Sequence, residues 1–242
     1  MKLLLHTCCA PCSGAIIETL LKEGIKPVIY YCNPNIYPFE EYEKRKTECS
    51  RYAAECGLEM VDADYNHDVW LQCISGLEHE PERGARCMEC FRHRLLSSAQ
   101  YAVHHGFDTL ATTLASSRWK NLNQVNAAGL WAVEKANAEA ALWRELDDSR
   151  IPLPQVDELG NILKTSEELL AEPRQQGAAT VPAGAPVGAS PAVSAVPSVR
   201  LVWWDRNWRK GGLQERRNEI IKERNFYNQK WCGCEFSIEN TL

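Results

Sequence analysis

The sequence lacks any apolar run close to the roughly 20 residues that a helix needs to cross a bilayer. It also lacks a signal-peptide pattern, because Met1-Lys2 is followed by only three leucines before His6. We therefore expect a cytoplasmic protein with no membrane partner. An excess of positive charge is missing too. The 242 residues carry a net charge of −5, so bulk charge gives no argument for a nucleic-acid partner.

A phosphate-binding loop is also missing where one would be expected. The loop after the first apolar segment reads CCAPCSG, which is not the Gly/Ser-rich cradle that holds phosphates at the start of a helix. Only Ser13-Gly14 could serve there. A nucleotide-activating ATP enzyme is therefore disfavoured.

Cysteine, in contrast, is abundant, with eleven residues. In a reducing compartment such a number is typical of metal ligands or redox thiols, and an odd count argues against full disulfide pairing. A lone buried cysteine usually behaves as a small apolar residue. We therefore interpret four isolated cysteines as structural: Cys32, Cys49, Cys56 and Cys73.

Strand and helix patterns alternate along most of the chain. The predicted strands cover residues 2–7, 26–34, 58–65, 107–114 and a segment from 199 on. The predicted helices cover residues 11–23, 38–57, 67–78, 87–106 and 213–227. This spacing is that of repeated βαβ units and predicts an α/β fold with a parallel sheet covered by helices on both faces. Such sheets bind ligands outside the carboxyl ends of their strands, which is where Cys8, Cys9 and Cys12 fall.

The middle of the chain has a different composition. Residues 137–150 look helical, whereas 24 of the 29 residues from 171 to 199 are Ala, Pro, Gly, Val or Ser. A segment of that composition cannot bury a core and is typical of a flexible insertion. We expect a single α/β catalytic domain made of residues 1–134 and 200–242, interrupted by an insertion at 135–199.

Two cysteine pairs form the first candidate site, Cys8-Cys9 and the C-x2-C pair Cys87 and Cys90. A C-x2-C at a helix start puts two thiolates about a turn apart, beside backbone N–H groups that favour negative charge. Four sulfur ligands suit either zinc or an iron–sulfur cluster. Neighbouring side chains on extended backbone point apart, so the vicinal pair favours the wider cluster over one small ion. The alternative is a Cys87/Cys90 redox pair beside two thiols that merely line a turn.

Cys232 and Cys234 form the second candidate site, separated only by Gly233. Their disulfide would close a small, strained ring, and strained disulfides are reducible and tend to be regulatory or catalytic. A metal-ligand pair or two spare thiols remain the alternatives.

A basic segment forms the third candidate site. Residues 200–230 contain nine basic and four acidic residues, with six aromatic residues among residues 200–231. Basic side chains can neutralise phosphates and aromatic rings can stack on unpaired bases, so Arg206, Arg209 and Lys210 are candidates for contacting nucleic acid. A solvated helix face beside tryptophans that fill the core is an equally good interpretation.

Six motifs, in order along the chain, resemble the QueH-type epoxyqueuosine reductase family: HTCCAPC, CNPNIYPFEEYEKRKTE, ARCMECFRHRL, TLATTLASSRWKN, DRNWRKGGLQE and YNQKWCGCEFS. The resemblance extends over most of the chain apart from roughly residues 135–199. It implies reduction of epoxyqueuosine to queuosine at the wobble position of tRNA, on a fold resembling the nucleotide α-hydrolase (HUP-like) type. The long insertion departs from the compact family pattern.

The same resemblance assigns roles to the cysteines. Four residues match the ligands of a [4Fe-4S] cluster: Cys8, Cys9, Cys87 and Cys90. Cys232 and Cys234 match a redox-active disulfide. The family is also associated with one additional metal ion, iron or zinc, and a carboxylate can occupy the position of Cys12.

A division of labour follows as a hypothesis. The metal site that includes Cys12 engages the epoxide, the cluster relays electrons, and Cys232 and Cys234 supply the second equivalent or couple to an unidentified electron donor. Candidate acids are His6, Tyr37 and Glu89. The alternative from another class is a zinc-stabilised RNA-binding module without catalysis.

Overall fold

The computed structural model describes residues 1–117, 120–148, 155–156, 162–164, 199–229 and 231–237. The chain divides into two compact units, Met1–Ala140 with Pro197–Leu242, and Ala141–Val196. In the second unit, β5 (Gln155–Val156) and β6 (Ile162–Lys164) form an antiparallel pair. Residues 171–198 of the segment predicted to be flexible lie outside the described residues.

The first unit is built on a sheet of five parallel strands in the order β3-β2-β1-β4-β7. The strands are β1 (Leu3–His6), β2 (Val28–Tyr31), β3 (Met60–Asp62), β4 (Thr109–Thr112) and β7 (Val202–Trp203). The predicted α/β fold with a parallel sheet is confirmed. β1 is central and buried at every residue, as expected for a parallel sheet covered on both faces. The likeness to the nucleotide α-hydrolase type stays a prediction.

The helices follow the predicted pattern with one exception. They are α1 (Ala10–Lys22), α2 (Phe39–Glu55), α3 (His67–Cys73), α4 (Ala85–His104), α5 (Leu122–Asp148) and α7 (Leu213–Glu223). Two short 3-10 turns accompany them, η1 (Thr113–Ser116) and η2 (Glu235–Ser237). The exception is α5, which begins at Leu122 and not at residue 137. Among the described residues, no helix combines the length and the apolar character needed to cross a membrane.

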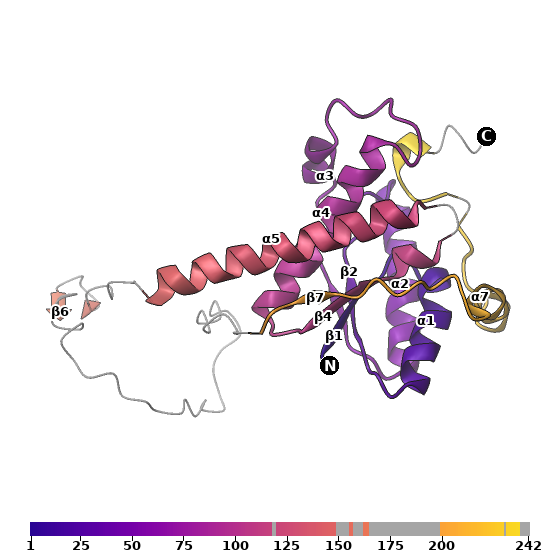
Figure 1. Ribbon diagram of the computed structural model, residues 1–242. Coiled ribbons are helices and arrows are strands. Elements are labelled where there is room, and N and C mark those ends of the chain that lie inside the picture. Colours follow the sequence, from indigo (N-terminus) through magenta and orange to yellow (C-terminus); the bar gives the residue numbers. More distant parts are fainter. Residues whose placement is uncertain (118–119, 149–154, 157–161, 165–198, 230, 238–242) are drawn as a thin grey trace. The chain divides into compact units, whose positions relative to one another are not determined.

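Two neighbouring tyrosines of β2 identify the helices that cover each face of the sheet. Successive strand side chains point to opposite faces. The Tyr30 hydroxyl lies 3.2 Å from Ser97 Oγ on α4, whereas the Tyr31 hydroxyl donates to the Tyr42 carbonyl on α2 at 3.4 Å. Helices α4 and α2 therefore cover opposite faces (Figure 1).

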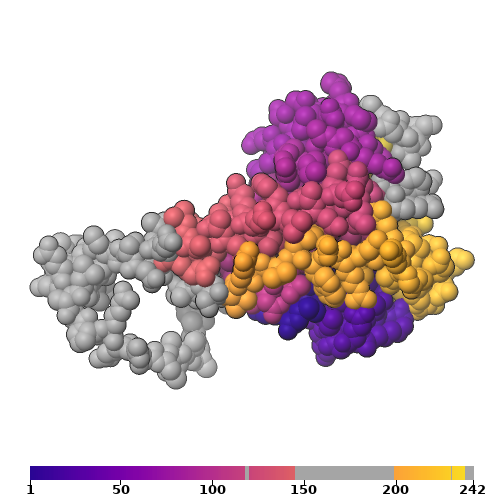
Figure 2. Space-filling view, in the orientation of Figure 1, coloured from indigo at the N-terminus to yellow at the C-terminus, as the bar shows by residue number. Residues whose placement is uncertain are grey.

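The carboxyl-terminal part of the first unit returns to the sheet beside α5. Asn137 on α5 donates to the Leu201 carbonyl at 2.9 Å and accepts from the Leu201 N–H at 3.0 Å. A Cβ on Gly129 would stand only 2.3 Å from Trp203 Cε2, so α5 can approach β7 only because residue 129 is glycine. Figure 2 shows the orange residues that begin near residue 200 lying across the surface between α5 and the amino-terminal residues.

Candidate functional site

A cavity of about 1040 Å³ lies at the carboxyl edge of the sheet, lined by residues that follow β1, β2 and β4. Six cysteines from three segments line it: Cys8, Cys12, Cys87, Cys90, Cys232 and Cys234. The charged residues of the wall are seven cations and two carboxylates: Arg45, Arg83, Arg86, Arg94, Lys120, Arg209, Arg217, Glu82 and Glu215. The wall is therefore rich in sulfur and in positive charge, within a protein of net charge −5.

The first thiol group stands where β1 turns into α1. The sulfur atoms of Cys8, Cys9 and Cys12 all lie within 4.8 Å of one another. Cys9 is the extended N-cap residue of α1 and its carbonyl accepts the Cys12 N–H at 3.2 Å, so the first helical turn brings Cys12 back to the pair. Hydrogen bonds from Cys12 and Cys9 hold the pKa of Cys8 well below its usual range. The group therefore favours a thiolate on Cys8.

The other two sulfurs of this group favour the thiol form. Burial raises the pKa of Cys9, and the hydrogen bond with Cys8 raises the pKa of Cys12 to about 12. Cys9 does not line the cavity: it is 1% exposed and accepts a hydrogen bond from Gln229 Nε2 at 2.6 Å. Gln229 thereby ties the carboxyl-terminal tail to the start of α1.

The second thiol group joins α4 to the tail. Cys87 and Cys90 lie near the start of α4, and Cys87 Sγ accepts the Arg83 backbone N–H at 3.2 Å. Burial raises the pKa of Cys87. Cys90 and Cys234 pack in one apolar cluster around Trp70, whose side chain is fully buried. Residues more than 140 positions apart in the sequence thus meet at this wall.

Cys232 and Cys234 are both free thiols with unlike acidities. Their mutual hydrogen bond holds the pKa of Cys232 well below its usual range and raises that of Cys234. A thiolate beside a thiol is the arrangement from which thiol–disulfide exchange proceeds.

Two hydrogen bonds and a glycine-specific conformation fix the backbone between these two cysteines. Arg45 Nη1 donates to the Cys232 carbonyl at 3.2 Å, and the Tyr37 N–H donates to the Gly233 carbonyl at 2.9 Å. Gly233 has a φ of 100°, and a Cβ there would lie 2.8 Å from Ile36 Cγ1. Only glycine fits this position, for both its backbone conformation and its space.

Lys120 is a cation of this wall that sequence reasoning missed. Burial acts to lower the pKa of its ammonium, but the negative charges of Cys232 and Cys8 outweigh burial and the pKa is raised. Lys120 in turn acts to lower the pKa of both cysteines. One available signal was its position soon after the fourth predicted strand, at the same sheet edge as the first cysteines.

The three residues predicted to contact nucleic acid lie in three different environments. Arg206 forms a two-pronged ion pair with Glu23, with both N–O distances 2.6 Å, and does not line the cavity. Arg209 lines it but donates to the backbone carbonyls of three residues that follow β4: Ala115, Ser117 and Lys120. Lys210 is exposed between β7 and α7, outside the cavity wall.

The three candidate acids also lie outside the cavity wall. His6 is fully buried, with its ring nitrogens 2.8 Å from Thr112 Oγ1 and 3.1 Å from the Cys32 carbonyl, and burial lowers its pKa to about 3. The ring of Tyr37 stacks on that of His67, and Glu89 forms an ion pair with Arg92 on α4.

None of the four cysteines interpreted as structural lines the cavity. Burial raises the pKa of Cys32 and Cys49. Cys56 is half-buried, and Cys73 is exposed, with its sulfur 3.3 Å from His93 Nδ1.

Unpartnered polar atoms test whether this wall fits a bound cofactor. Among the described residues, ten buried side-chain nitrogen or oxygen atoms have no hydrogen-bond partner, and six of them belong to cavity-lining residues. Three of the six are donors: Trp70 Nε1, Arg86 Nε and Trp231 Nε1. Leaving such a donor without a partner costs about 1–3 kcal/mol. Soft thiolates together with unused donors fit a sulfur-ligated metal or an iron–sulfur group.

Fold and site together define an α/β protein with a thiol-lined, cationic cavity at the carboxyl edge of its parallel sheet. The family model described as Epoxyqueuosine reductase QueH matches residues 3–147 and 190–240. The chain belongs to the QueH family. It is 37% identical over 240 residues to Epoxyqueuosine reductase QueH of Histophilus somni, covering 99% of this chain and 73% of the relative. The protein of the same name from Haemophilus influenzae is 36% identical, in an alignment that covers 99% of this chain and 73% of the relative. The one from Acinetobacter baylyi is 35% identical, over 99% of this chain and 82% of the relative.

The alignment with the Histophilus somni protein spans 99% of this chain, whereas the family model leaves residues 148–189 unmatched. The unmatched range lies within the predicted insertion at 135–199, whose two ends the family model does match.

Proposed function

We propose that the protein is an epoxyqueuosine reductase that converts epoxyqueuosine to queuosine at the wobble position of tRNA. The observation that carries the proposal is the meeting of six cysteines from three distant segments at one cavity, in a chain of the QueH family. Removing the epoxide oxygen to leave an alkene and water takes two electrons and two protons. A site of closely spaced thiols is suited to that electron count.

The proposed ligands of a [4Fe-4S] cluster are Cys8, Cys9, Cys87 and Cys90, and Cys12 would contribute to an adjacent iron or zinc ion. When bound, the cluster would transfer electrons one at a time, and the lone ion would act as a Lewis acid on the epoxide oxygen. The pKa of Cys8 is already low, so this residue is ready to ligate as a thiolate. Cys9 is the ligand whose sulfur is held by Gln229, away from the cavity wall.

Cys232 and Cys234 are the proposed dithiol. Oxidation of two thiols to a disulfide releases two electrons and two protons, which balances the reduction of one epoxide. An external electron donor must then reduce the disulfide again. The low pKa of Cys232 makes it the better leaving sulfur when the donor attacks Cys234. Lys120 offsets the negative charge of the Cys8 and Cys232 thiolates.

Anaerobic purification followed by iron and acid-labile sulfide analysis tests the cofactor, read beside the queuosine content of tRNA in a deletion strain. We expect about four sulfides per protein, with about four irons if the adjacent ion is zinc and about five if it is iron. We also expect epoxyqueuosine to accumulate in the strain. Protein without iron, or a strain with normal queuosine, contradicts the proposal.

A zinc-stabilised RNA-binding module is the second candidate function. The sulfurs of Cys8, Cys9 and Cys12, within 4.8 Å of one another, favour it because three thiolates can hold one small ion. Stoichiometric zinc, no sulfide and tRNA binding without turnover would support this alternative.

A further inference from the structure

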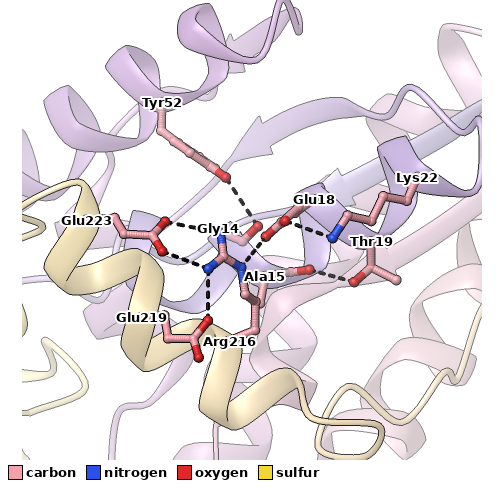
Figure 3. A network of polar contacts seen from close by, with 9 residues as sticks. All are labelled: Gly14, Ala15, Glu18, Thr19, Lys22, Tyr52, Arg216, Glu219 and Glu223. Atoms are coloured by element: carbon pink, nitrogen blue, oxygen red, sulfur yellow. Dashed lines mark hydrogen bonds and ion pairs between the residues drawn. The ribbon is translucent and has the colours of Figure 1, made fainter.

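The basic segment on α7 divides according to what its guanidinium groups contact. Arg216 donates to Glu18 of α1 at 2.7 Å, and to Glu219 and Glu223 of its own helix at 2.9 and 2.8 Å (Figure 3). This network joins α7 to α1, the helix that carries the first thiol group. Arg216 therefore fixes the position of α7 at the edge of the cavity.

Arg217, the next residue of α7, lines the cavity. Its guanidinium donates to the amide oxygens of Asn218 at 3.2 Å and Asn228 at 3.5 Å. Among the described residues, no carboxylate forms an ion pair with Arg217, unlike its neighbour Arg216. Its positive charge reaches Cys12, on whose pKa it has a lowering effect.

These three side chains present several hydrogen-bond donors at the rim of the cavity. The two amide oxygens accept from the guanidinium, which leaves both amide NH2 groups as donors for a further acceptor. Asn218 and Asn228 are exposed at the rim. A planar guanidinium flanked by amide donors matches the oxygens of a phosphate, and such contacts position a nucleic acid without reading its sequence.

We propose that Arg217, Asn218 and Asn228 form a rim site that binds a phosphodiester of RNA next to the nucleotide whose base enters the cavity. The inference rests on the proposed function and names a contact for its substrate. A cavity of about 1040 Å³ has room for a base and its sugar, and the flanking phosphates then stay at the rim. The excess of cations on the wall favours that polyanion over a protein partner.

Salt-dependent RNA binding tests the rim site. The probe is a fluorescein-labelled anticodon stem-loop RNA, titrated by anisotropy into the anaerobically purified full-length protein between about 50 and 200 mM salt. One lost phosphate contact on single-stranded RNA reduces the slope of log K against log salt by about 0.7. For Arg217→Gln we expect this reduction, so that the wild-type affinity falls about 2.6-fold more than that of the variant across the fourfold salt range.

Lys222→Gln is the matched control, because it removes one positive charge from the same helix at an exposed residue outside the cavity wall. We expect its slope to equal that of the wild type. Arg217→Lys keeps the charge and loses the planar fork, so its slope should be normal and its affinity lower. Inorganic phosphate at matched ionic strength should compete weakly, because a free ion lacks the adjoining nucleotide.

Equal slopes for Arg217→Gln and Lys222→Gln overturn the rim site, while wild-type binding and turnover still support the proposed function. Strong competition by inorganic phosphate overturns the assignment to RNA backbone. Failure of the wild-type protein to bind the stem-loop and to convert modified tRNA contradicts the proposed function itself. If Arg217→Gln does not fold, Asn228→Ala provides the second test, with lower affinity at an unchanged slope expected.

Discussion

Gly233→Ala should destabilise the tail that carries Cys232 and Cys234. At a φ of 100° an alanine pays a left-handed backbone penalty of about 1–2 kcal/mol. Its Cβ would also stand 2.8 Å from Ile36 Cγ1 and 3.0 Å from Arg45 Nη1, and such overpacking costs about 1–3 kcal/mol. Together these two effects should destabilise the docked tail by about 2–5 kcal/mol. The loss cannot exceed the free energy with which the tail binds the rest of the domain, because beyond that point the tail detaches.

Gly24→Ala is the matched control for this variant. Gly24 has a φ of 76° just after α1, and a Cβ there meets nothing within 4 Å, so the control carries the backbone penalty alone. The assays are urea denaturation and the alkylation rate of Cys234, mapped by mass spectrometry. Cys234 is 6% exposed, so detachment of the tail should accelerate its alkylation. The reasoning is refuted if Gly233→Ala matches Gly24→Ala in both stability and alkylation.

The cluster ligands, the contact between α5 and β7, and the insertion each give a further prediction. Cys87→Ser should lose iron and activity while Cys73→Ser, at an exposed cysteine away from the cavity, keeps both; full iron in the first variant means that the ligand assignment is incorrect. Gly129→Ala should lower the melting temperature by several degrees, because its Cβ would meet Trp203 at 2.3 Å and overpacking costs about 1–3 kcal/mol; an unchanged melting curve contradicts the close approach of α5 and β7. Deleting residues 171–199 behind a short Gly/Ser link should leave folding and iron content intact, as proposed for an insertion into a domain made of 1–134 and 200–242; a large loss of folded yield shows instead that the segment packs on the domain.

The sheet could be predicted from the sequence because each strand is a short apolar run between helix patterns. Lys2 to Thr7 and residues 107–114 are examples, and the structure pairs β1 with β4 in parallel. The parallel arrangement in turn predicts that residues after β1, β2 and β4 gather at one edge. That general property of parallel sheets explains why Cys8 and Cys12 were recognisable as site candidates.

The start of α5 could not be predicted, and the reason is a tertiary contact. Gly129 lies in the interior of the helix, where glycine is unfavourable by about 1 kcal/mol relative to alanine. The helix continues through it because Trp203 of β7 occupies the space that a Cβ would take. A prediction from local helix propensity includes only the unfavourable effect of this glycine. It cannot include the packing partner, which lies 74 positions further along the chain.

The sulfur of the site could be predicted but most of its positive charge could not. Cysteine spacing is visible in the sequence, whereas the fate of each arginine depends on its partners. Arg206 and Arg216 form ion pairs with carboxylates, whereas Arg217 is hydrogen-bonded to an asparagine. Lys120 acts on two thiol groups that lie 112 positions before and after it along the chain. Only the folded arrangement distinguishes these side chains.

Nucleoside analysis of tRNA after reaction with the protein is the decisive test of the proposed reductase activity. The substrate is tRNA from a strain that accumulates epoxyqueuosine, incubated anaerobically with the reduced, iron-loaded protein, and the readout is mass spectrometry of the digested nucleosides. We predict that, with the protein in excess over tRNA, epoxyqueuosine disappears and queuosine, lighter by one oxygen atom, appears in equal amount. The Cys232→Ser/Cys234→Ser protein should retain iron but leave epoxyqueuosine unconverted. Epoxyqueuosine that persists unchanged with the iron-loaded wild-type protein contradicts the proposed reductase activity.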